Sequence, residues 1–292
     1  MDNNTFKQQA TKVSLVSIFG NIFLSLFKLL AGIFAHSAAM VSDAVHSASD
    51  VFSSIIVIIG VRMAAKDADD DHPYGHERLE SVAAITLAIV LLVTGLFIGH
   101  TAIENLSAGD SAEHMIPGIL ALVAAIVSIV TKEGMYWYTR FYARKINSDA
   151  LMADAWHHRS DALSSIGALV GIYGARRGLW WFDSVASLII SLFIIKAAYD
   201  IFRNAIEKLV DRACEPEFDE EIRKLVLLQD GVEKIDMLQT RVFGNRIYVD
   251  LEIAANGELK LREAHDIAQK VHDVLEEKYP RIKHIMIHVN PI

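Results

Sequence analysis

Residues 37–64 read SAAMVSDAVHSASDVFSSIIVIIGVRMA, an apolar stretch long enough to cross a bilayer that nevertheless carries His46 and Asp50. A later apolar segment repeats the pair as His157 and Asp161. Each pair is spaced i, i+4, so on a helix both side chains project from one face, one turn apart. Two such faces brought together supply two imidazoles and two carboxylates, the donor set of a tetrahedral Zn²⁺-type site. Ionisable residues in a bilayer are costly and usually functional, so the sequence predicts metal handling within a membrane.

The composition is uneven along the chain. Its 292 residues are 52% hydrophobic and 22% charged, with a mean hydropathy of +0.30, which is more apolar than most soluble domains. Long apolar runs fill the chain up to about residue 210, and the remainder is charged. The sequence therefore predicts a membrane part followed by a soluble part.

Charge and cysteine content exclude several classes of protein and site. The net charge of −8 argues against nucleic acid as a partner. A single cysteine, Cys214, excludes an intrachain disulfide and any Cys-based zinc site, so metal ligands must come from His, Asp and Glu. A polar start, Met1 to Lys12, precedes a long first apolar run, and no cleavable signal peptide is expected.

The apolar segments predict six helices that cross roughly 30 Å of hydrocarbon. They are 12–34, 37–64, 80–106, 114–143, 148–175 and 179–207. We therefore expect an all-α membrane domain over residues 1–208. Charged residues interrupt several of these segments, among them Lys28, Lys132, Glu133 and Lys196. Lys28 and Lys196 need the bundle interior or a route for the side chain to the membrane surface.

The positive charges of the short loops predict the orientation of the helices in the membrane. One side carries eight cationic residues: Lys7, Lys12, Arg62, Lys66, Arg78, Arg140, Arg144 and Lys145. The other side carries only Arg176 and Arg177. Since cytoplasmic loops are enriched in Lys and Arg, both termini are expected in the cytoplasm.

Residues 209–292 are predicted to form a small α/β domain. Helices are expected at 217–228 and 261–279, and strands at 232–241, 245–253 and 283–289. This order favours an open sheet with its helices on one face. In the strand Ile247-Tyr-Val-Asp-Leu-Glu-Ile253 apolar and polar residues alternate, which places Asp250 on the face away from the helices. The same alternation places His284 and His288 on that polar face.

A second group of candidate ligands lies between the second and third segments. Asp69, His72 and His76 are able to hold a metal ion with water as the fourth ligand. Pro73 and Gly75 make this stretch a loop, so no helix fixes its geometry. The alternative is a solvated acidic linker.

A third group lies in the tail and comprises Asp236, Asp250, His265 and His288, with Asn290 near the end of the chain. Surface His and Asp residues are common, so each of these is also consistent with an ordinary polar surface. An oligomer would bring two such polar faces together.

The charge of the four intramembrane residues suggests that the site exchanges metal for protons. Two neutral imidazoles and two ionised carboxylates carry −2, which a divalent cation cancels. Without metal, protons on the same groups relieve the same charge. Metal and protons then compete for one site.

Four passages together resemble the cation diffusion facilitator family of metal/proton antiporters. They are Ser42-Asp-Ala-Val-His-Ser-Ala-Ser-Asp50, His72-Pro-Tyr-Gly-His-Glu-Arg-Leu-Glu80, Ala153-Asp-Ala-Trp-His-His-Arg-Ser-Asp161 and Leu209-Val-Asp-Arg212. The resemblance covers nearly the whole chain. It implies six transmembrane helices followed by a cytoplasmic metallochaperone-like, ferredoxin-like α/β domain over 209–292.

The resemblance also implies roles for particular residues. It implies a transport site at His46, Asp50, His157 and Asp161, and this two-His, two-Asp form is similar to zinc transporters. It further implies the loop site, a homodimer whose tails bind zinc across their interface, and an ion pair between Arg78 and Asp211 at the membrane surface. In the tail, His265 and His288 match the family pattern. Asp236 and Asp250 stand where some members have His, and Asn290 stands where they have Asp.

The leading hypothesis is a Zn²⁺/H⁺ antiporter, rather than an enzyme, that exports metal from the cytoplasm, with Cd²⁺, Fe²⁺ or Mn²⁺ as alternative cargo. It is expected in the lipid bilayer of the bacterial cytoplasmic membrane. A membrane metal sensor or scaffold that binds without transporting is the second hypothesis. An intramembrane metalloprotease is disfavoured, because His76-Glu-Arg-Leu-Glu80 lacks the second His of a zincin helix. No role is assigned to Asp43.

Overall fold

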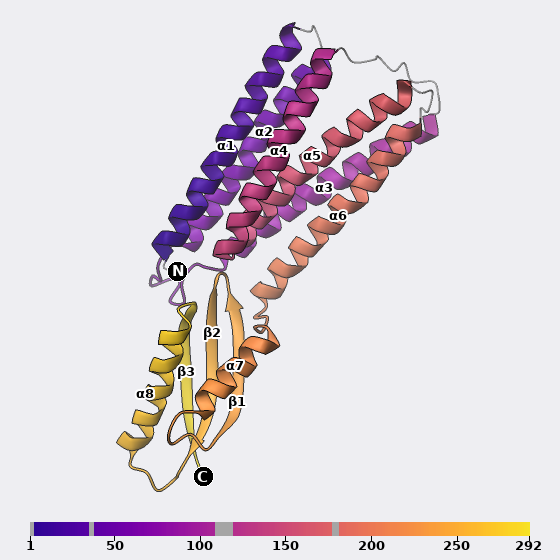
Figure 1. Ribbon diagram of the computed structural model, residues 1–292. Helices are drawn as coiled ribbons and strands as arrows, with labels where there is room; N and C mark the ends of the chain where they lie inside the picture. Colours follow the sequence, from indigo (N-terminus) through magenta and orange to yellow (C-terminus); the bar gives the residue numbers. More distant parts are fainter. Residues whose placement is uncertain (1–2, 35–37, 109–118, 177–180) are drawn as a thin grey trace. The chain divides into compact units, whose positions relative to one another are not determined.

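The computed structural model describes residues 3–34, 38–108, 119–176 and 181–292 (Figure 1). Within these ranges some side chains, among them those of Asp43 and His46, lie outside the described residues. The chain divides into two compact units, one ending at Ala205 and one running from Ile206 to Ile292. The positions of the two units relative to one another are not determined.

Six long helices make up the first unit. They are α1 (Asn3–Phe34), α2 (Ala38–Ala64), α3 (Leu79–Ala108), α4 (Ile119–Ile146), α5 (Asp149–Arg176) and α6 (Trp181–Leu209). Within the described residues, each overlaps one of the six predicted apolar segments, so the prediction of six helices is confirmed. The predicted starts at 37, 114 and 179 lie outside the described residues.

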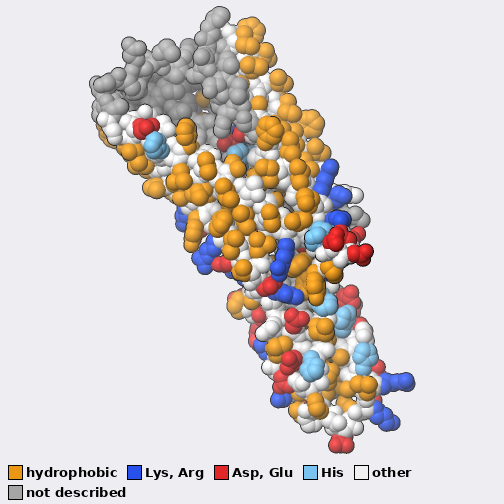
Figure 2. Space-filling model, turned by 180° about the vertical axis from the view of Figure 1, so that it is seen from behind, with side chains coloured by type: hydrophobic (Ala, Val, Ile, Leu, Met, Phe, Trp, Pro, Cys, Tyr) orange, Lys and Arg blue, Asp and Glu red, His pale blue; other side chains and the backbone are white. Residues whose placement is uncertain are grey.

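The helical unit exposes apolar side chains and buries several ionisable ones beside an aliphatic core. Phe19, Phe97 and Phe193 are 68%, 71% and 62% exposed, whereas Lys132 and Asp50 are buried. Figure 2 shows hydrophobic side chains over the described surface of this unit. This distribution is typical of membrane helices, whose apolar side chains face lipid and whose ionisable residues face the bundle interior.

Hydropathy alone identifies fewer spans than the fold contains. Among the described residues, two helical stretches are long and apolar enough by composition, Thr5–Ala31 in α1 and Leu79–Ser107 in α3. Buried ionisable residues lie on α2, α4 and α5, and also on α1 at Lys28 and on α3 at Glu80.

Small residues allow the helices to approach closely. α1 packs on α2 and α4, and α5 packs on α2, α3 and α4. A methyl group added to Gly60 of α2 would lie 2.3 Å from the Cβ of Ala83 on α3. That distance is far inside van der Waals contact, so the crossing of α2 and α3 requires a glycine here.

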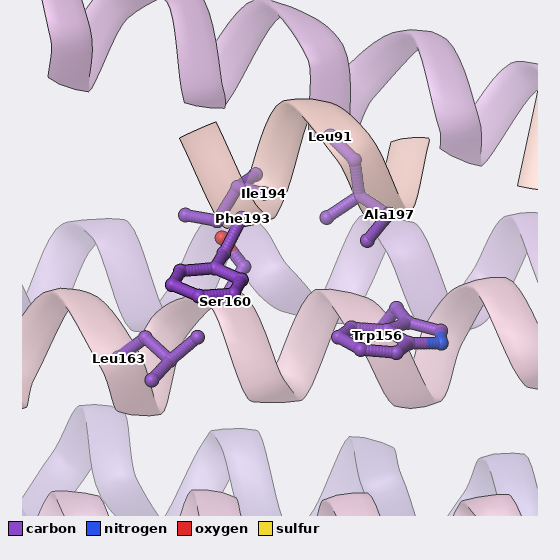
Figure 3. Close-up of a pocket in the computed structure, with 7 residues that line it drawn as sticks. All are labelled: Leu91, Trp156, Ser160, Leu163, Phe193, Ile194 and Ala197. Atoms are coloured by element: carbon purple, nitrogen blue, oxygen red, sulfur yellow. The ribbon is translucent and has the colours of Figure 1, made fainter. Parts of the chain in front are cut away.

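A small cavity lies where α3, α5 and α6 meet (Figure 3). Its lining is apolar apart from one hydroxyl and consists of Leu91, Trp156, Ser160, Leu163, Phe193, Ile194 and Ala197. None of these residues belongs to a predicted metal site. An apolar cavity of this kind is a packing defect that water does not favour.

The second unit is a three-stranded sheet with two helices. Its elements are α7 (Pro216–Leu227), β1 (Lys234–Phe243), β2 (Arg246–Ala255), α8 (Leu261–Lys278) and β3 (Ile282–Pro291). The strand order is β1-β2-β3, with β1 antiparallel and β3 parallel to the central β2. The predicted order of elements is confirmed.

One face of the sheet is covered by the helices. Ile222 of α7 and Ile267, Val271 and Leu275 of α8 recur at helical spacing and pack in one core with the odd-numbered residues 247–253 of β2. The even-numbered residues of β2 face the other way, where Asp250 pairs with Met286 and Glu252 with His288. The predicted polar face with Asp250, His284 and His288 is therefore confirmed.

Candidate metal sites

The intramembrane site is assembled from α2 and α5. Asp50 comes from α2, and His157 and Asp161 come from successive turns of α5. His157 Nε2 lies 3.5 Å from Asp50 Oδ1 and 4.0 Å from Asp161 Oδ2. The candidate ligand atoms of the three residues all lie within 4.8 Å of one another. The structure thus brings together three members of the predicted quartet, and the side chain of His46 lies outside the described residues.

The three side chains are shielded from solvent. Asp50, His157 and Asp161 are 3%, 7% and 10% exposed. Neither ring nitrogen of His157 has a hydrogen-bond partner among the described residues. Its Nε2 has only the ion-pair contacts with Asp50 and Asp161, an arrangement that fits an imidazole able to bind an ion beside two carboxylates.

A lysine that sequence reasoning treated as an interruption lies in the middle of this site. Lys132 Nζ of α4 donates to Asp50 Oδ2 at 2.6 Å and to Asp161 Oδ2 at 2.7 Å. Its third hydrogen bond goes to Asn21 Oδ1 of α1 at 2.8 Å. The Lys132 side chain is 1% exposed. Its contacts bring α1 and α4 into the site beside α2 and α5.

The periodicity of α4 contained a signal for this position. Ser128, Lys132, Met135 and Thr139 recur at spacings of three and four, and all are buried. The neighbouring Glu133 points elsewhere and pairs with Arg159 of α5. The polar and small residues thus mark the buried face of α4.

A second buried pair lies one turn away along α5, and the sequence reasoning did not single it out. Asp154 and His158 are both fully buried, with Asp154 Oδ2 3.5 Å from His158 Nε2. Ser54 of α2 donates to Asp154 at 3.4 Å, and His158 Nε2 lies 3.1 Å from the hydroxyl of Ser17 on α1. The i, i+4 spacing of this Asp and His was the available signal.

The loop group comes together as well. His72 Nδ1 lies 3.2 Å from Asp69 Oδ1, and His76 Nε2 lies 3.5 Å from Asp69 Oδ2. His76 Nδ1 donates to the carbonyl of Asp67 at 3.2 Å, which turns Nε2 toward Asp69. The three candidate ligand atoms lie within 4.8 Å of one another. The geometry is that of an ordered turn and disfavours a loose acidic linker.

Backbone hydrogen bonds fix this turn. The amides of Asp69 and His72 each donate to the other residue's carbonyl, at 3.3 and 3.1 Å. Gly75, at φ 92°, donates to the carbonyl of His72. A hydrogen bond from Lys66 holds the pKa of Asp69 well below its ordinary value, and Lys66 is the cationic partner of this ionised carboxylate.

The predicted tail ligands do not converge within one chain. Asp250 and His288 lie on the polar face of the sheet, whereas His265 lies exposed on α8, the helix that packs on the opposite face. Among the described residues, three or more candidate ligands come together only in the intramembrane and loop groups. A tail site across a dimer interface stays a prediction.

Asp236 and Asn290 meet at one end of the polar face. Asn290 Nδ2 donates to Asp236 Oδ2 at 2.9 Å and lies 3.4 Å from Glu252 Oε2. Lys234 also bonds Asp236 at 2.8 Å and lowers the pKa of its carboxyl. Asp236 is thus already paired within its own chain.

The predicted ion pair of Arg78 and Asp211 joins residues of different units and stays a prediction. Within its own unit, Asp211 lies 3.7 Å from Arg241 Nη1. Asp211 has a φ of 61°, so it forms a left-handed turn directly after α6.

Sequence comparisons cover both units. Residues 14–210 match the family described as the cation efflux transmembrane domain, and residues 214–292 match the cytoplasmic domain of cation efflux proteins. An uncharacterized transporter of Methanocaldococcus jannaschii is 38% identical over 283 residues, covering 97% of this chain and 99% of that protein. The manganese efflux system protein MneP of Bacillus subtilis is 31% identical over 292 residues, covering 98% and 97%.

Solved structures also match the second unit. The C-terminal domain of a MamM variant in its cadmium form is 21% identical, with a TM-score of 0.26. It covers 26% of this chain and 96% of that one.

Proposed function

The chain belongs to the cation efflux family of membrane transporters, and from that premise we propose that it is a Zn²⁺/H⁺ antiporter that exports metal from the cytoplasm. It is an integral membrane transporter of divalent metal cations and not an enzyme. Beyond family membership, we propose that the exchanged ion is the proton, that the main cargo is Zn²⁺, and that both use the buried cluster of the helical unit. It places both termini in the cytoplasm, as the distribution of loop Lys and Arg favours.

The observation that carries the proposal is the buried cluster of Asp50, His157 and Asp161 between two membrane helices. Transporter sites lie within the membrane between elements that are able to rearrange around a fixed ion. His46 lies one turn before Asp50 on α2 and is proposed as the fourth ligand. Alternating access around this site would expose the ion first to one side of the membrane and then to the other.

Proton coupling is proposed from the chemistry of the ligands. A metal binds the neutral imidazole and the ionised carboxylate, so protons on these groups must leave before the metal is bound. When the metal departs, protons return to the same atoms. Uphill metal movement is then driven by downhill proton movement.

Zinc is proposed as the main cargo because the donor set combines imidazole nitrogen with carboxylate oxygen in fourfold coordination. Manganese is the second candidate, and the similarity to a manganese efflux protein favours it. Carboxylate-rich sites suit Mn²⁺, whereas imidazole favours Zn²⁺. Cd²⁺ and Fe²⁺ are the remaining alternatives.

The matched cytoplasmic domain spans 214–292, and we propose that the functional unit is a homodimer formed through it. A dimer would bring two polar sheet faces together and give the tail residues His265 and His288 a second set of partners. The alternative function, a sensor that binds metal without moving it, would use this domain alone.

The test is metal flux in proteoliposomes under an imposed pH gradient. We expect proton-dependent Zn²⁺ uptake by the wild type and none above protein-free liposomes for Asp50→Ala, because a ligand of the site is lost. Glu104→Gln is the matched control, since it removes a carboxylate that is 66% exposed on α3. Its flux should equal that of the wild type.

Each outcome has a distinct meaning. Wild-type flux in a folded Asp50→Ala protein contradicts the assignment of the site. Zn²⁺ binding without flux in the wild type favours the sensor. Parallel runs with Mn²⁺, Cd²⁺ and Fe²⁺ rank the cargo, and faster Mn²⁺ than Zn²⁺ uptake would replace zinc by manganese.

A further inference from the structure

The ammonium of Lys132 lies where an ion held by Asp50 and Asp161 would lie. We propose that Lys132 is a tethered counter-cation that the divalent cargo must displace, and that it thereby sets the affinity of the site. The proposal rests on the proposed function, because it takes Asp50 and Asp161 as cargo ligands.

The contacts of Lys132 saturate its donors. An ammonium has three N–H groups, and Asn21, Asp50 and Asp161 accept all three at 2.6–2.8 Å. Both carboxylates give Oδ2 to the lysine. An ion that draws these two oxygens into its own coordination shell therefore takes them away from Nζ.

Charge repulsion prevents the ammonium of Lys132 and the divalent cargo from binding the two carboxylates at the same time. A divalent ion bonded to both carboxylates would stand within a few ångströms of the ammonium, in a site with almost no contact with solvent. Like charges at that separation repel strongly where water does not screen them. The lysine must therefore move when the cargo binds, and part of the binding free energy of the cargo is used to move it.

The structure offers the displaced lysine a neutral acceptor. Asn21 Oδ1 of α1 already accepts from Nζ at 2.8 Å. The flexible side chain of Lys132 retains this contact while its bonds to the carboxylates break. Asn21 is thus the expected resting point of the ammonium in the metal-bound protein.

Exchange of one occupant for the other favours divalent cargo. When Na⁺ or K⁺ takes the place of the ammonium, the net charge of the two carboxylates and the bound cation stays at −1. When a divalent ion takes its place, that net charge becomes zero. A monovalent ion therefore has no electrostatic advantage over the lysine, which already makes charge-assisted hydrogen bonds. Lys132 is on this argument a specificity-determining residue.

The first test compares Zn²⁺ affinity of full-length wild type and Lys132→Met at one pH. Asp50→Asn is added to each of the two proteins, and the Zn²⁺ binding that then remains is subtracted. Ions bound at the loop and in the tail are thereby left out of the comparison. We expect Lys132→Met to bind at least about tenfold more tightly, because the competing charge is gone. Equal or weaker binding overturns the proposal and leaves Lys132 a structural partner of the two carboxylates.

Lys28→Met is the matched control. Lys28 is also a buried lysine, 3% exposed on α1, and its Nζ donates to the hydroxyl of Ser47 at 2.9 Å. Its removal deletes a buried ammonium that makes no described bond to Asp50 or Asp161. Its Zn²⁺ affinity should equal that of the wild type, and a gain as large as that of Lys132→Met overturns the proposal.

A second measurement needs no variant and so does not depend on the folding of one. In a structure of the wild type with Zn²⁺ at the site, Nζ of Lys132 should have left both carboxylates. A Zn²⁺-bound structure that keeps both hydrogen bonds overturns the proposal.

The binding test also separates this proposal from the proposed function. If neither the wild type nor Lys132→Met shows Asp50-dependent binding of Zn²⁺, or of Mn²⁺ in a parallel run, both proposals are wrong. Equal Asp50-dependent binding overturns the role of Lys132 alone.

Discussion

Individual ion pairs stabilise the charged side chains inside the helical unit. Lys132 balances one of the two charges of Asp50 and Asp161, and Glu133 and Arg159 balance one another beside them. Removing one partner of a buried ion pair costs about 3–5 kcal/mol, since the other charge is left uncompensated. Lys132, Asp50 and Asp161 share hydrogen bonds and are therefore coupled, so substitutions among these three will not be additive.

At the loop site, His76→Ala should remove one bound metal ion per protomer and leave flux through the membrane site intact. The substitution deletes the buried ligand and its hydrogen bond to the Asp67 carbonyl, while Asp69 and His72 remain. Equilibrium dialysis with Zn²⁺ measures the count. His100→Ala, at a histidine that is 71% exposed on α3, is the control. An unchanged count in His76→Ala would contradict a metal site in this loop.

The thiol of Cys214 should react slowly with maleimide at neutral pH. Burial raises its pKa above the ordinary value, so at a given pH less of it is the reactive thiolate than in an unfolded chain. The labelling rate of the folded protein should rise steadily as the pH increases from 7 to 9, and at each pH it should stay below that of the protein unfolded in detergent. Equal rates at pH 8 would show that the thiol is not shielded.

The site residues that occur in a repeated pattern could be predicted from the sequence, whereas a site residue without such a pattern could not. The i, i+4 pairs of His and Asp predicted a cluster, and the structure brings Asp50, His157 and Asp161 together. Lys132 has no such partner in its own segment, because its partners lie on α1, α2 and α5. A single charge in an apolar segment reads as an interruption until the neighbouring helices are known.

At the scale of elements, the closest approach in the helical unit depends on Gly60. Gly60→Ala should destabilise the protein by about 1–3 kcal/mol, because the new methyl group forces α2 and α3 apart. The thermal midpoint in detergent measures the effect. Combining it with Ala83→Gly removes the clashing carbon and should restore most of the loss.

Gly134→Ala is the matched control for that prediction. A methyl group at Gly134 of α4 would meet nothing within 4 Å, so this change should be neutral or slightly stabilising, since alanine favours the helix. A drop in midpoint as large as that of Gly60→Ala would mean that the crossing is not the cause.

The elements themselves were predictable because each depends on local pattern. The three strands follow from alternation of apolar and polar residues, and the sheet buries the apolar set of β2 as expected. All six apolar segments were visible in the sequence although buried ionisable residues lie within them, such as Lys28 of α1 and Lys132 of α4.

For the whole molecule, the two units contribute different chemistry to one transporter. The helical unit holds the buried cluster of Asp50, His157 and Asp161, and the second unit presents a polar face with Asp250, Glu252 and His288. The pairing of such faces in a dimer depends on two copies, which one sequence does not reveal. This is why the tail ligands were the least predictable part of the candidate sites.

The aliphatic core of the helical unit bears on how leakage is prevented. Val57 and Val61 follow Asp50 along α2, and Ala150 and Ala153 precede His157 along α5, and all four are fully buried in one cluster. They therefore separate the ion site from the end of the bundle that carries the loop 65–78. An ion arriving from that end meets close-packed aliphatic side chains, with the buried pair Asp154 and His158 on the same stretch of α5, so packing restricts its path. A leak along this route therefore costs the free energy of disrupting a close-packed cluster that joins α1 to α5.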